Sequence, residues 1–303
     1  MELIRRVKQM QEICLRLKRE GKTIGLVPTM GYLHAGHLSL AQRARKENDI
    51  VVMSNFVNPL QFGPKEDFAT YPRDLERDNK LAADVGVDYV FAPTEEEMYP
   101  ENYSTYVEVT GEVTEKMCGI SRPGHFKGVT TVVCKLFLIT QADRAYFGQK
   151  DAQQAIVIRK MVQDLNLPLE IVTCPIIREE DGLALSSRNT YLSPEEREQA
   201  LALPRALRAG QQLIQEGERD PNRVKEKILQ ILESSPGIRV DYVEVVDGDT
   251  LSEMVELKGH VLLAAAVYVG KARLIEDPPG CFNRCQFKLC RQHHHRPGPF
   301  RGG

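Results

Sequence analysis

The strongest constraint on the fold of this chain is the alternation of apolar runs with helical patterns between residues 23 and 175. Short runs rich in β-branched and aromatic residues, which suit buried strands, lie at 23–29, 50–56, 87–93, 144–148 and 169–175. Segments with apolar residues at helical spacing separate them, at 37–48, 74–86, 126–141 and 151–166. Strands separated by helices form βαβ units, so we expect an α/β fold with a mostly parallel sheet. Ligands of such sheets bind at the carboxyl ends of the strands.

After residue 175 the pattern changes. A polar link at 175–196 contains SPEE, a plausible helix N-cap followed by proline, and leads into two predicted helices at about 194–217 and 220–234. Three apolar runs follow, at 240–247, 259–270 and 271–277, and predict a small antiparallel sheet with a tight turn at VGKA. We therefore expect a first domain at 1–176 and a smaller α+β domain at 177–277, with the link crossing the cleft between them.

The last segment, 278–303, is rich in Pro, Gly, Arg, Cys and His and has no periodicity. Its cysteines and histidines (Cys281, Cys285, Cys290 and His293–His295) are zinc-ligand types, but their spacing matches no compact zinc motif. A disordered extension or a frame-shifted end is the favoured interpretation.

Composition excludes several classes of protein. The formal net charge of -2 argues against a protein that grips nucleic acid by its phosphates. No apolar run approaches the roughly 20 residues that cross a bilayer. Residues 1–22 carry charges every few positions and predict an amphipathic helix instead of a signal peptide, which places the chain in the cytoplasm. The scattered Cys14, Cys118, Cys134 and Cys174 then read as ordinary buried thiols.

The stretch PTMGYLHAGH (28–37) follows the first predicted strand and opens a helix. A helix N-terminus exposes unpaired N–H groups and the positive end of the helix dipole, and both favour phosphate. His34 and His37 are three residues apart and share a face, whereas Gly36 lacks a Cβ and lets a ring approach the backbone. A helix cap with two solvated histidines is the alternative, but the preceding strand and PTMG favour the phosphate site.

Two further stretches suit phosphate binding. LALSSRN (183–189) lies in the polar link, where two hydroxyls and a guanidinium can wrap a polyphosphate, although the same residues make an ordinary loop. FGQKDAQQ (147–154) leaves a strand and enters a helix. Lys150 can meet a phosphate there, Asp151 suits the first helical turn and Gln154 projects one turn later, whereas a capped surface turn is the alternative.

The long loop at 55–74 carries two amides, Asn58 and Gln61, among apolar residues. Loops of this length usually have a function, and two amides can select a hydroxylated substrate. The sequence contains no P-loop, G-x-G-x-x-G or G-x-S-x-G motif. His125 and His260 stand apart from any metal-ligand pattern, so we expect a structural role or a minor site contact for each.

These stretches together resemble a known family. HAGH is similar to the HxGH signature of the nucleotidyltransferase superfamily, and LSSRN to a lysine-poor version of the second signature of class I aminoacyl-tRNA synthetases. The family most closely resembled, from residue 1 to about 277, is pantothenate synthetase (pantoate–β-alanine ligase), through LVPTMGYLHAGH, NFVNPLQFG, YPRD, RPGHFKGV, YFGQKDAQQ and DGLALSSRNTYLS. The resemblance implies a Rossmann-like N-terminal domain, a C-terminal lid domain and a homodimer. It also implies that ATP, (R)-pantoate and β-alanine give pantothenate, AMP and diphosphate through a pantoyl adenylate, with Mg²⁺ whose ligands it leaves unassigned.

The resemblance further implies roles for individual residues. Contacts to ATP are expected from Pro28, Thr29, Met30, Gly31, His34, Gly36, His37, Gly148, Gln149, Lys150, Asp151, Ile177, Leu185, Ser186, Ser187 and Arg188. Those expected to be catalytic are His34, His37, Lys150, Ser186, Ser187 and Arg188. Contacts to pantoate or β-alanine are expected from Met30, Asn58, Gln61 and Gln154. Tyr71, Asp78 and Arg122 match positions near the site, and Leu185 replaces the methionine of many relatives with little change in volume.

The chemistry of adenylation suits these residues independently of the family. A carboxylic acid is already ionised at pH 7, so the first step needs alignment and charge neutralisation and no general base. In the second step the amine of β-alanine must lose a proton, and the sequence does not identify the acceptor. An adenylyltransferase that keeps AMP on its product is the nearest rival, but such chains are usually shorter and lack NPLQF. A non-catalytic RNA-binding relative is disfavoured by the net charge.

Overall fold

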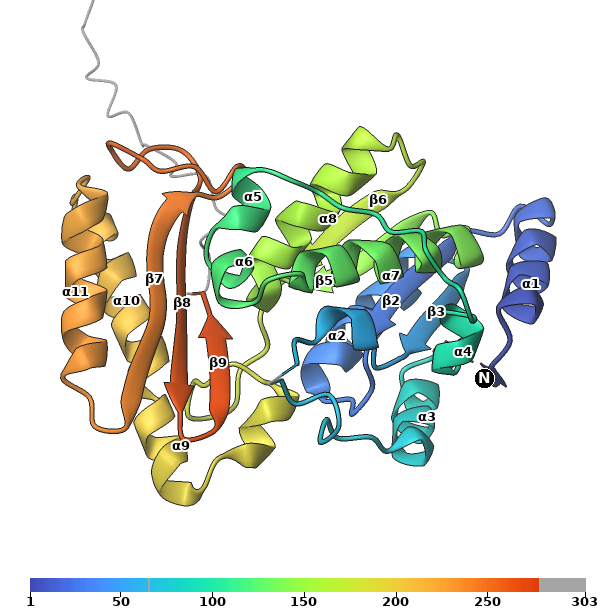
Figure 1. Cartoon of the computed structure of the whole chain (residues 1–303), viewed down its shortest axis with the longest axis horizontal. Helices are drawn as coiled ribbons and strands as arrows, with labels where there is room; N and C mark the ends of the chain where they lie inside the picture. The colour runs from blue at the N-terminus through green and yellow to red at the C-terminus, as the bar shows by residue number, and fades with distance from the viewer. Residues whose placement is uncertain (65, 278–303) are drawn as a thin grey trace, which may run out of the picture.

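The computed structural model describes residues 1–64 and 66–277 (Figure 1). Its larger sheet has six parallel strands in the order β1-β4-β3-β2-β5-β6. The strands are β1 (Glu2–Ile4), β2 (Ile24–Thr29), β3 (Ile50–Asn55), β4 (Tyr89–Phe91), β5 (Arg144–Gly148) and β6 (Glu170–Cys174). The predicted α/β fold with a parallel sheet is confirmed. The predictions for 278–303 lie outside the described residues.

Helices cover both faces of this sheet. The helices of this part are α1 (Val7–Arg19), α2 (Ala35–Glu47), α3 (Leu75–Asp84), α4 (Glu95–Met98), α5 (Glu112–Glu115), α6 (Cys118–Ser121), α7 (His125–Thr140) and α8 (Ala152–Asp164), with single turns η1 (Pro59–Gln61) and η2 (Gln149–Asp151). Successive strand residues point to opposite faces, so Leu26 packs with α1, α7 and α8 whereas Val27 packs with α2 and α3. Both faces of the sheet are therefore covered by helices, which explains why the strand sequences are continuous apolar runs.

The strand order places a topological switch point between β2 and β5. From β2 the chain passes outward to β3 and β4 on one side, and it later continues through β5 and β6 on the other. The loops that follow β2 and β5 leave the sheet in opposite directions, and the crevice between them is where open α/β sheets bind ligands. The two sequence stretches that follow these strands, 28–37 and 147–154, are thereby brought together.

A second sheet is antiparallel and has three strands, β7 (Ile238–Asp247), β8 (Val261–Val269) and β9 (Ala272–Glu276), as predicted. The remaining helical elements are η3 (Ser187–Tyr191), α9 (Pro194–Ala200), α10 (Ala202–Gln215) and α11 (Pro221–Glu233). One face of the sheet packs on α10 and α11, and the other faces α5, α6 and the start of α8 (Figure 1). Gly270 adopts a φ of 53° in the two-residue turn between paired Val269 and Ala272, so the tight turn at VGKA is confirmed.

Two predicted helices need correction. Residues 1–22 do not form one helix, because Glu2–Ile4 pair with β4 as an edge strand before α1 begins at Val7. The stretch 194–217 is divided into α9 and α10 at Leu201. Pro204 explains the break, since its ring would clash with the carbonyl of Ala200 four residues earlier. The predicted cap before α9 is confirmed, with Ser193 and Glu196 forming a capping box.

Other expectations concern burial. The four cysteines Cys14, Cys118, Cys134 and Cys174 are free and buried, as predicted. Among the described residues, no helix combines the length and the apolarity that crossing a membrane requires. The same residues contain no group of three or more His, Cys, Asp or Glu side chains that could hold a metal ion.

Candidate active site

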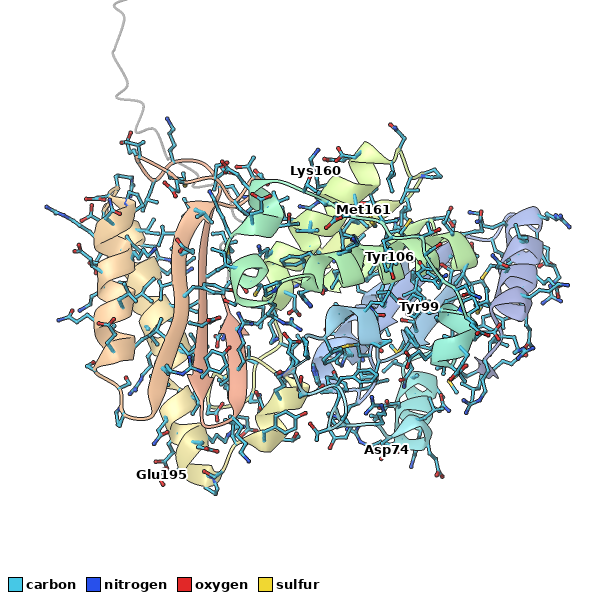
Figure 2. All side chains as sticks on the ribbon, viewed as in Figure 1. Asp74, Tyr99, Tyr106, Lys160, Met161 and Glu195 are labelled. Carbon is cyan, nitrogen blue, oxygen red and sulfur yellow. The ribbon has the colours of Figure 1, made fainter. Side chains whose placement is uncertain are left out.

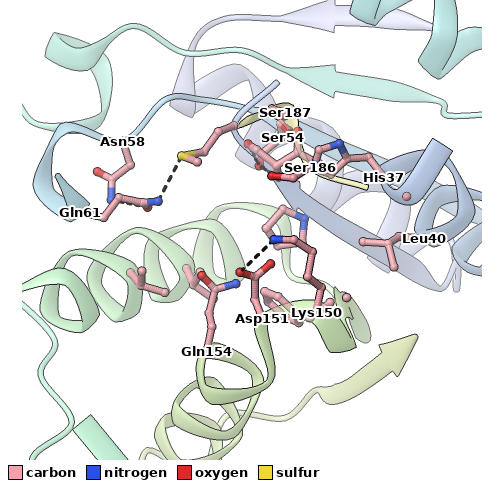
Figure 3. Close-up of a pocket in the computed structure, with 18 of the residues that line it drawn as sticks. His37, Leu40, Ser54, Asn58, Gln61, Lys150, Asp151, Gln154, Ser186 and Ser187 are labelled. Carbon is pink, nitrogen blue, oxygen red and sulfur yellow. Dashed lines mark hydrogen bonds and ion pairs between the residues drawn. The ribbon is translucent and has the colours of Figure 1, made fainter. Parts of the chain in front are cut away.

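A cavity lies at the carboxyl ends of β2 and β5, bounded by α2, η1, α7, the start of α8 and the segment after β6 (Figure 3). Most of the predicted site residues line it: Pro28, Thr29, Met30, His34, Gly36, His37, Asn58, Gln61, Gly148, Lys150, Asp151, Gln154, Ile177, Leu185, Ser186, Ser187 and Arg188. Tyr71 and Arg122 line it too. Segments from four distant parts of the sequence thus converge on one space.

Both histidines of HAGH take part in capping α2. His34 is the N-cap, and its Nδ1 accepts the Gly36 N–H at 3.1 Å. The His37 Nδ1 accepts the His34 N–H at 3.4 Å, and the two rings stack with centroids 3.9 Å apart. Because each Nδ1 is an acceptor, each neutral ring carries its proton on Nε2.

The surroundings keep both rings neutral. Burial, and then the positive charge of Lys150, lower the pKa of His34 to about 4. Burial, followed by His34 and Lys150, holds the pKa of His37 well below its ordinary value. Gly36 makes the arrangement possible, because a Cβ there would lie 2.8 Å from the His34 ring, as the sequence predicted. The pair therefore offers two neutral N–H donors at a helix N-terminus, a suitable arrangement for an anion.

The opposite wall comes from the turn between β5 and α8 (Figure 3). Lys150 is mostly buried, and its Nζ lies 3.9 Å from Asp151, at the limit of an ion pair. Asp151 is the one carboxylate among the described residues that line the cavity, against the cations Lys150, Arg122 and Arg188. Glu66 and Asp67 lie behind this lining and pair with Arg122 and Arg188, so the lining presents cationic donors to a ligand with several negative charges without an excess of positive charge.

The link after β6 closes a third side. Ser186 caps η3 by accepting the Arg188 N–H at 3.3 Å, and the Ser187 hydroxyl donates to the Tyr32 carbonyl at 3.4 Å. Arg188 donates from Nε and Nη2 to both oxygens of Asp67, at 3.1 and 2.9 Å. Burial opposes ionisation of Asp67, but Arg188 outweighs it and lowers the pKa of that carboxyl. The bidentate pair leaves Nη1 of Arg188 for another ligand.

The loop after β3 supplies the amides. Asn58 caps η1, and its Oδ1 accepts the Leu60 N–H at 3.3 Å and the Tyr99 hydroxyl at 2.7 Å. Tyr99 follows α4 and lies against α7 (Figure 2). The Asn58 Nδ2 donates to Gln61 Oε1 at 3.1 Å, so the two amides form a connected pair at the cavity wall (Figure 3).

Comparison with known proteins decides the family. A model described as pantoate-beta-alanine ligase matches residues 2–278. The chain belongs to the pantoate–β-alanine ligase family. As a member, it is an enzyme that joins pantoate to β-alanine, and the expected family is confirmed.

Relatives match over almost their whole length. The pantothenate synthetase of Moorella thermoacetica is 59% identical over 277 residues, which cover 91% of this chain and 98% of the relative. That of Acetivibrio thermocellus is 57% identical with the same coverage. The crystal structure of pantothenate synthetase from Thermus thermophilus has a TM-score of 0.87 at 48% identity and covers 91% of this chain and 98% of its own. A Francisella tularensis pantoate-beta-alanine ligase, complexed with beta-gamma ATP and beta-alanine, has a TM-score of 0.73 at 35% identity and covers 91% of this chain and 97% of its own.

Three residues that the family resemblance pointed to lie outside the described lining of the cavity. Gly31 has a φ of 85° and an added Cβ would lie 2.3 Å from Asn55, so it serves the turn after β2. Gln149 is buried and donates from Nε2 to Asp277 at 3.1 Å. Asp78 lies behind the site, where its carboxylate accepts the N–H groups of Tyr32 and Leu33, each at 2.7 Å, and so holds the loop before α2.

Sequence reasoning missed several contributors to the cavity. Glu66 and Asp67 hold the two cavity arginines, and no spacing in the sequence signals these pairs. An apolar wall comes from one face of α7, at Val129, Val132, Val133 and Leu136. The i, i+3, i+4, i+7 spacing of this wall was visible in the sequence, but it reads equally well as core packing.

Proposed function

We propose that this cavity activates pantoate on ATP and then joins it to β-alanine, giving pantothenate, AMP and diphosphate through a pantoyl adenylate. The observation that carries this proposal is the meeting of His37, Lys150 and Arg188 around one cavity at the switch point of the sheet. Family membership supplies the two substrates that are condensed.

The phosphates of ATP lie, in this proposal, between the start of α2 and the link after β6. The Nε2–H groups of His34 and His37, the ammonium of Lys150 and Nη1 of Arg188, which the pair with Asp67 does not use, would bind their oxygens. Catalysis then consists of neutralising charge while the pantoate carboxylate attacks the α-phosphorus and diphosphate leaves. Removal of one oxyanion-hole donor costs about 2.7–4 kcal/mol in acyl transfer, and by analogy we expect a similar contribution from each donor here.

Pantoate would occupy the part of the cavity between η1 and α7. Its carboxylate and two hydroxyls need polar partners, which Gln61 and Gln154 supply from opposite walls (Figure 3). Its quaternary carbon bears two methyl groups, and these suit the apolar face of α7 at Val129, Val132 and Val133. A substrate without the hydroxyls would leave these amides unpaired inside the closed site, and we expect this to give the site its selectivity.

We infer that Mg²⁺ enters with the nucleotide. Mg²⁺ usually keeps several waters and binds through phosphate oxygens and one or two carboxylates, so no dedicated cage is needed. The described residues hold no group of three or more acidic or imidazole ligands, and Asp151 is the carboxylate at the cavity wall that would hold the ion. When bound, the ion would neutralise charge on the departing diphosphate.

We further propose that residues 1–176 bind ATP and pantoate and that 177–277 act as a lid. The adenylate must be kept from water until the amine arrives, and closure of a lid serves that purpose. Support comes from the link, which contributes Ile177, Leu185 and Arg188 to the cavity, and from Gln149, which bonds to Asp277 at the end of β9. A fall in the radius of gyration in solution on adding ATP and pantoate would test closure.

A homodimer is the proposed assembly. Exposed apolar side chains such as Leu138 on α7 and Tyr106 beside it offer surface for a second copy. Sedimentation equilibrium at several concentrations tests this proposal, and a mass of one chain throughout would refute it.

The decisive experiment for the reaction is exchange of labelled diphosphate into ATP without β-alanine. Exchange that requires pantoate establishes the adenylate half-reaction. With β-alanine present, free AMP and an amide identify the ligase, whereas AMP retained on the product identifies an adenylyltransferase. Absence of pantoate-dependent exchange would refute the proposal.

A further inference from the structure

A chain of hydrogen bonds runs behind the amide wall of the cavity, starting at Glu66. Arg122 donates from Nε and Nη2 to the two carboxylate oxygens of Glu66, at 2.7 and 2.6 Å, and both side chains are largely buried. Its Nη1 contacts His125 Nε2 at 2.9 Å, and its Nη2 also reaches the Gln61 carbonyl at 3.2 Å. All three guanidinium nitrogens are therefore engaged by the protein, in contrast to Arg188, whose pair with Asp67 leaves Nη1.

The position of Arg122 determines the tautomer of His125. A guanidinium only donates, so His125 Nε2 must accept and Nδ1 must carry the proton. That Nδ1–H donates to the Gln61 carbonyl at 2.9 Å. Burial, followed by Arg122, lowers the pKa of His125 to about 4, so the ring is neutral at pH 7. The Gln61 carbonyl thus accepts two hydrogen bonds from the same pair of side chains.

The Gln61 side chain is oriented by a separate set of contacts. The Tyr99 hydroxyl and the Leu60 N–H both donate to Asn58 Oδ1, so the Asn58 Nδ2 must face Gln61 and Gly128. It donates to Gln61 Oε1, which leaves Gln61 Nε2 on the cavity side, 3.1 Å from the Met30 sulfur (Figure 3). Sulfur is a weak acceptor, so this N–H group can exchange it for a stronger acceptor such as a substrate oxygen.

We propose that Glu66, Arg122 and His125 are positioning residues that hold the Gln61 N–H donor where an oxygen of pantoate arrives. Arg122 and His125 line the cavity but act through Gln61, because their polar atoms are already bound to the protein. The proposal rests on the function proposed above. It assigns different roles to the two cavity arginines. Arg122 with Glu66 supports binding of the acid substrate, and Arg188 with Asp67 supports binding of the nucleotide.

Two neighbouring substitutions in one loop test this separation. Glu66→Gln removes the charge that holds Arg122 and should raise the KM for pantoate about tenfold, with the KM for ATP within about twofold of the wild-type value. Asp67→Asn should raise the KM for ATP and leave the KM for pantoate almost unchanged. Glu112→Gln removes an exposed carboxylate that pairs with Lys116 and should change neither value. Equal effects of Glu66→Gln on both KM values would overturn the proposal.

A second pair of variants tests the His125 tautomer without removing a charge. In His125→Asn the side-chain amide nitrogen reaches about as far as Nδ1 of the histidine did, so it can still donate to the Gln61 carbonyl. In His125→Gln the amide nitrogen reaches the place of the histidine Nε2 instead. We expect the KM for pantoate of His125→Asn to stay close to the wild-type value and that of His125→Gln to be higher. The opposite order would refute the tautomer.

The outcomes separate this proposal from the function on which it depends. Wild-type protein without pantoate-dependent exchange would refute the proposed function and the positioning role with it. Wild-type exchange together with an unchanged KM for pantoate in Glu66→Gln would refute the positioning role alone. Circular dichroism and thermal unfolding show that each variant is folded before its KM is compared.

Discussion

Replacing Gly128 by alanine should damage pantoate binding through the backbone of the amide loop. Gly128 lies near the start of α7, and an added Cβ would be 2.2 Å from the carbonyl oxygen of Leu60 and 2.6 Å from the Gln61 nitrogen. Both are backbone atoms, so no side chain can rotate away. Restoring an ordinary separation of about 3.4 Å requires the helix and the loop to move apart by about 1.2 Å (3.4 − 2.2).

A displacement of this size is large for a group that positions a substrate. Misplacement by about 1 Å costs about a hundredfold in rate, so we expect the exchange rate at subsaturating pantoate to fall by that factor. The fold should persist, because alanine in a helix gains up to about 1 kcal/mol over glycine and offsets part of an overpacking cost of about 1–3 kcal/mol. The KM for ATP should change little, since the residues proposed to bind its phosphates lie on other elements.

The assay is pantoate-dependent exchange of diphosphate into ATP, with ATP saturating. Gly63→Ala is the matched control, because it lies in the same loop and its Cβ would meet nothing closer than 3.7 Å. A folded Gly128→Ala protein with exchange within threefold of the wild type would refute the reasoning. A fall shared equally by Gly63→Ala would show that the loop, and not the contact with α7, is responsible.

Three further substitutions have defined outcomes. Lys150→Ala should lower pantoate-dependent exchange at least about a hundredfold in a folded protein, and a near-normal rate would refute its role. Burial raises the pKa of Asp277 from 3.8 to about 8. Between these pH values the carboxyl is protonated in the native state and ionised in the unfolded chain, so the free energy of unfolding falls as pH rises. Asp277→Asn should therefore stabilise the protein more at pH 8 than at pH 4 in thermal unfolding, and an equal gain at both would contradict this. Tyr99→Phe removes one donor to Asn58 and should cost about 1 kcal/mol in urea unfolding and raise the KM for pantoate.

The elements that sequence reasoning found best are those whose signal is local. The strands Ile24–Thr29 and Ile50–Asn55 are buried on both faces and read as unbroken apolar runs wherever they lie in the fold. Glu2–Ile4 carries no such signal, because three residues become a strand only by pairing with β4, far along the chain. Parallel topology then explains why the site could be anticipated, since it brings the strand-end motifs to one edge.

The partners of the site residues could not be anticipated. Glu66 meets Arg122 across 56 residues, and Asp67 meets Arg188 across 121, and each pair depends on the tertiary arrangement of loop 55–74. The tautomers of His34 and His125 likewise depend on which neighbour donates to the ring. Residue types at strand ends predicted which side chains line one cavity, whereas the direction of each hydrogen bond required coordinates.

The use of a histidine as the N-cap of α2 has a consequence for protein engineering. Stabilising a helix usually begins by installing Asp or Ser at its cap, because those side chains satisfy the first free N–H groups. At position 34 an aspartate would add negative charge opposite Lys150, where an incoming anion is expected, and a serine would be too short to serve both the helix and a ligand. Any attempt to raise thermal tolerance by redesigning this helix terminus should therefore lower turnover, because in the proposed function the same imidazole caps the helix and binds the nucleotide.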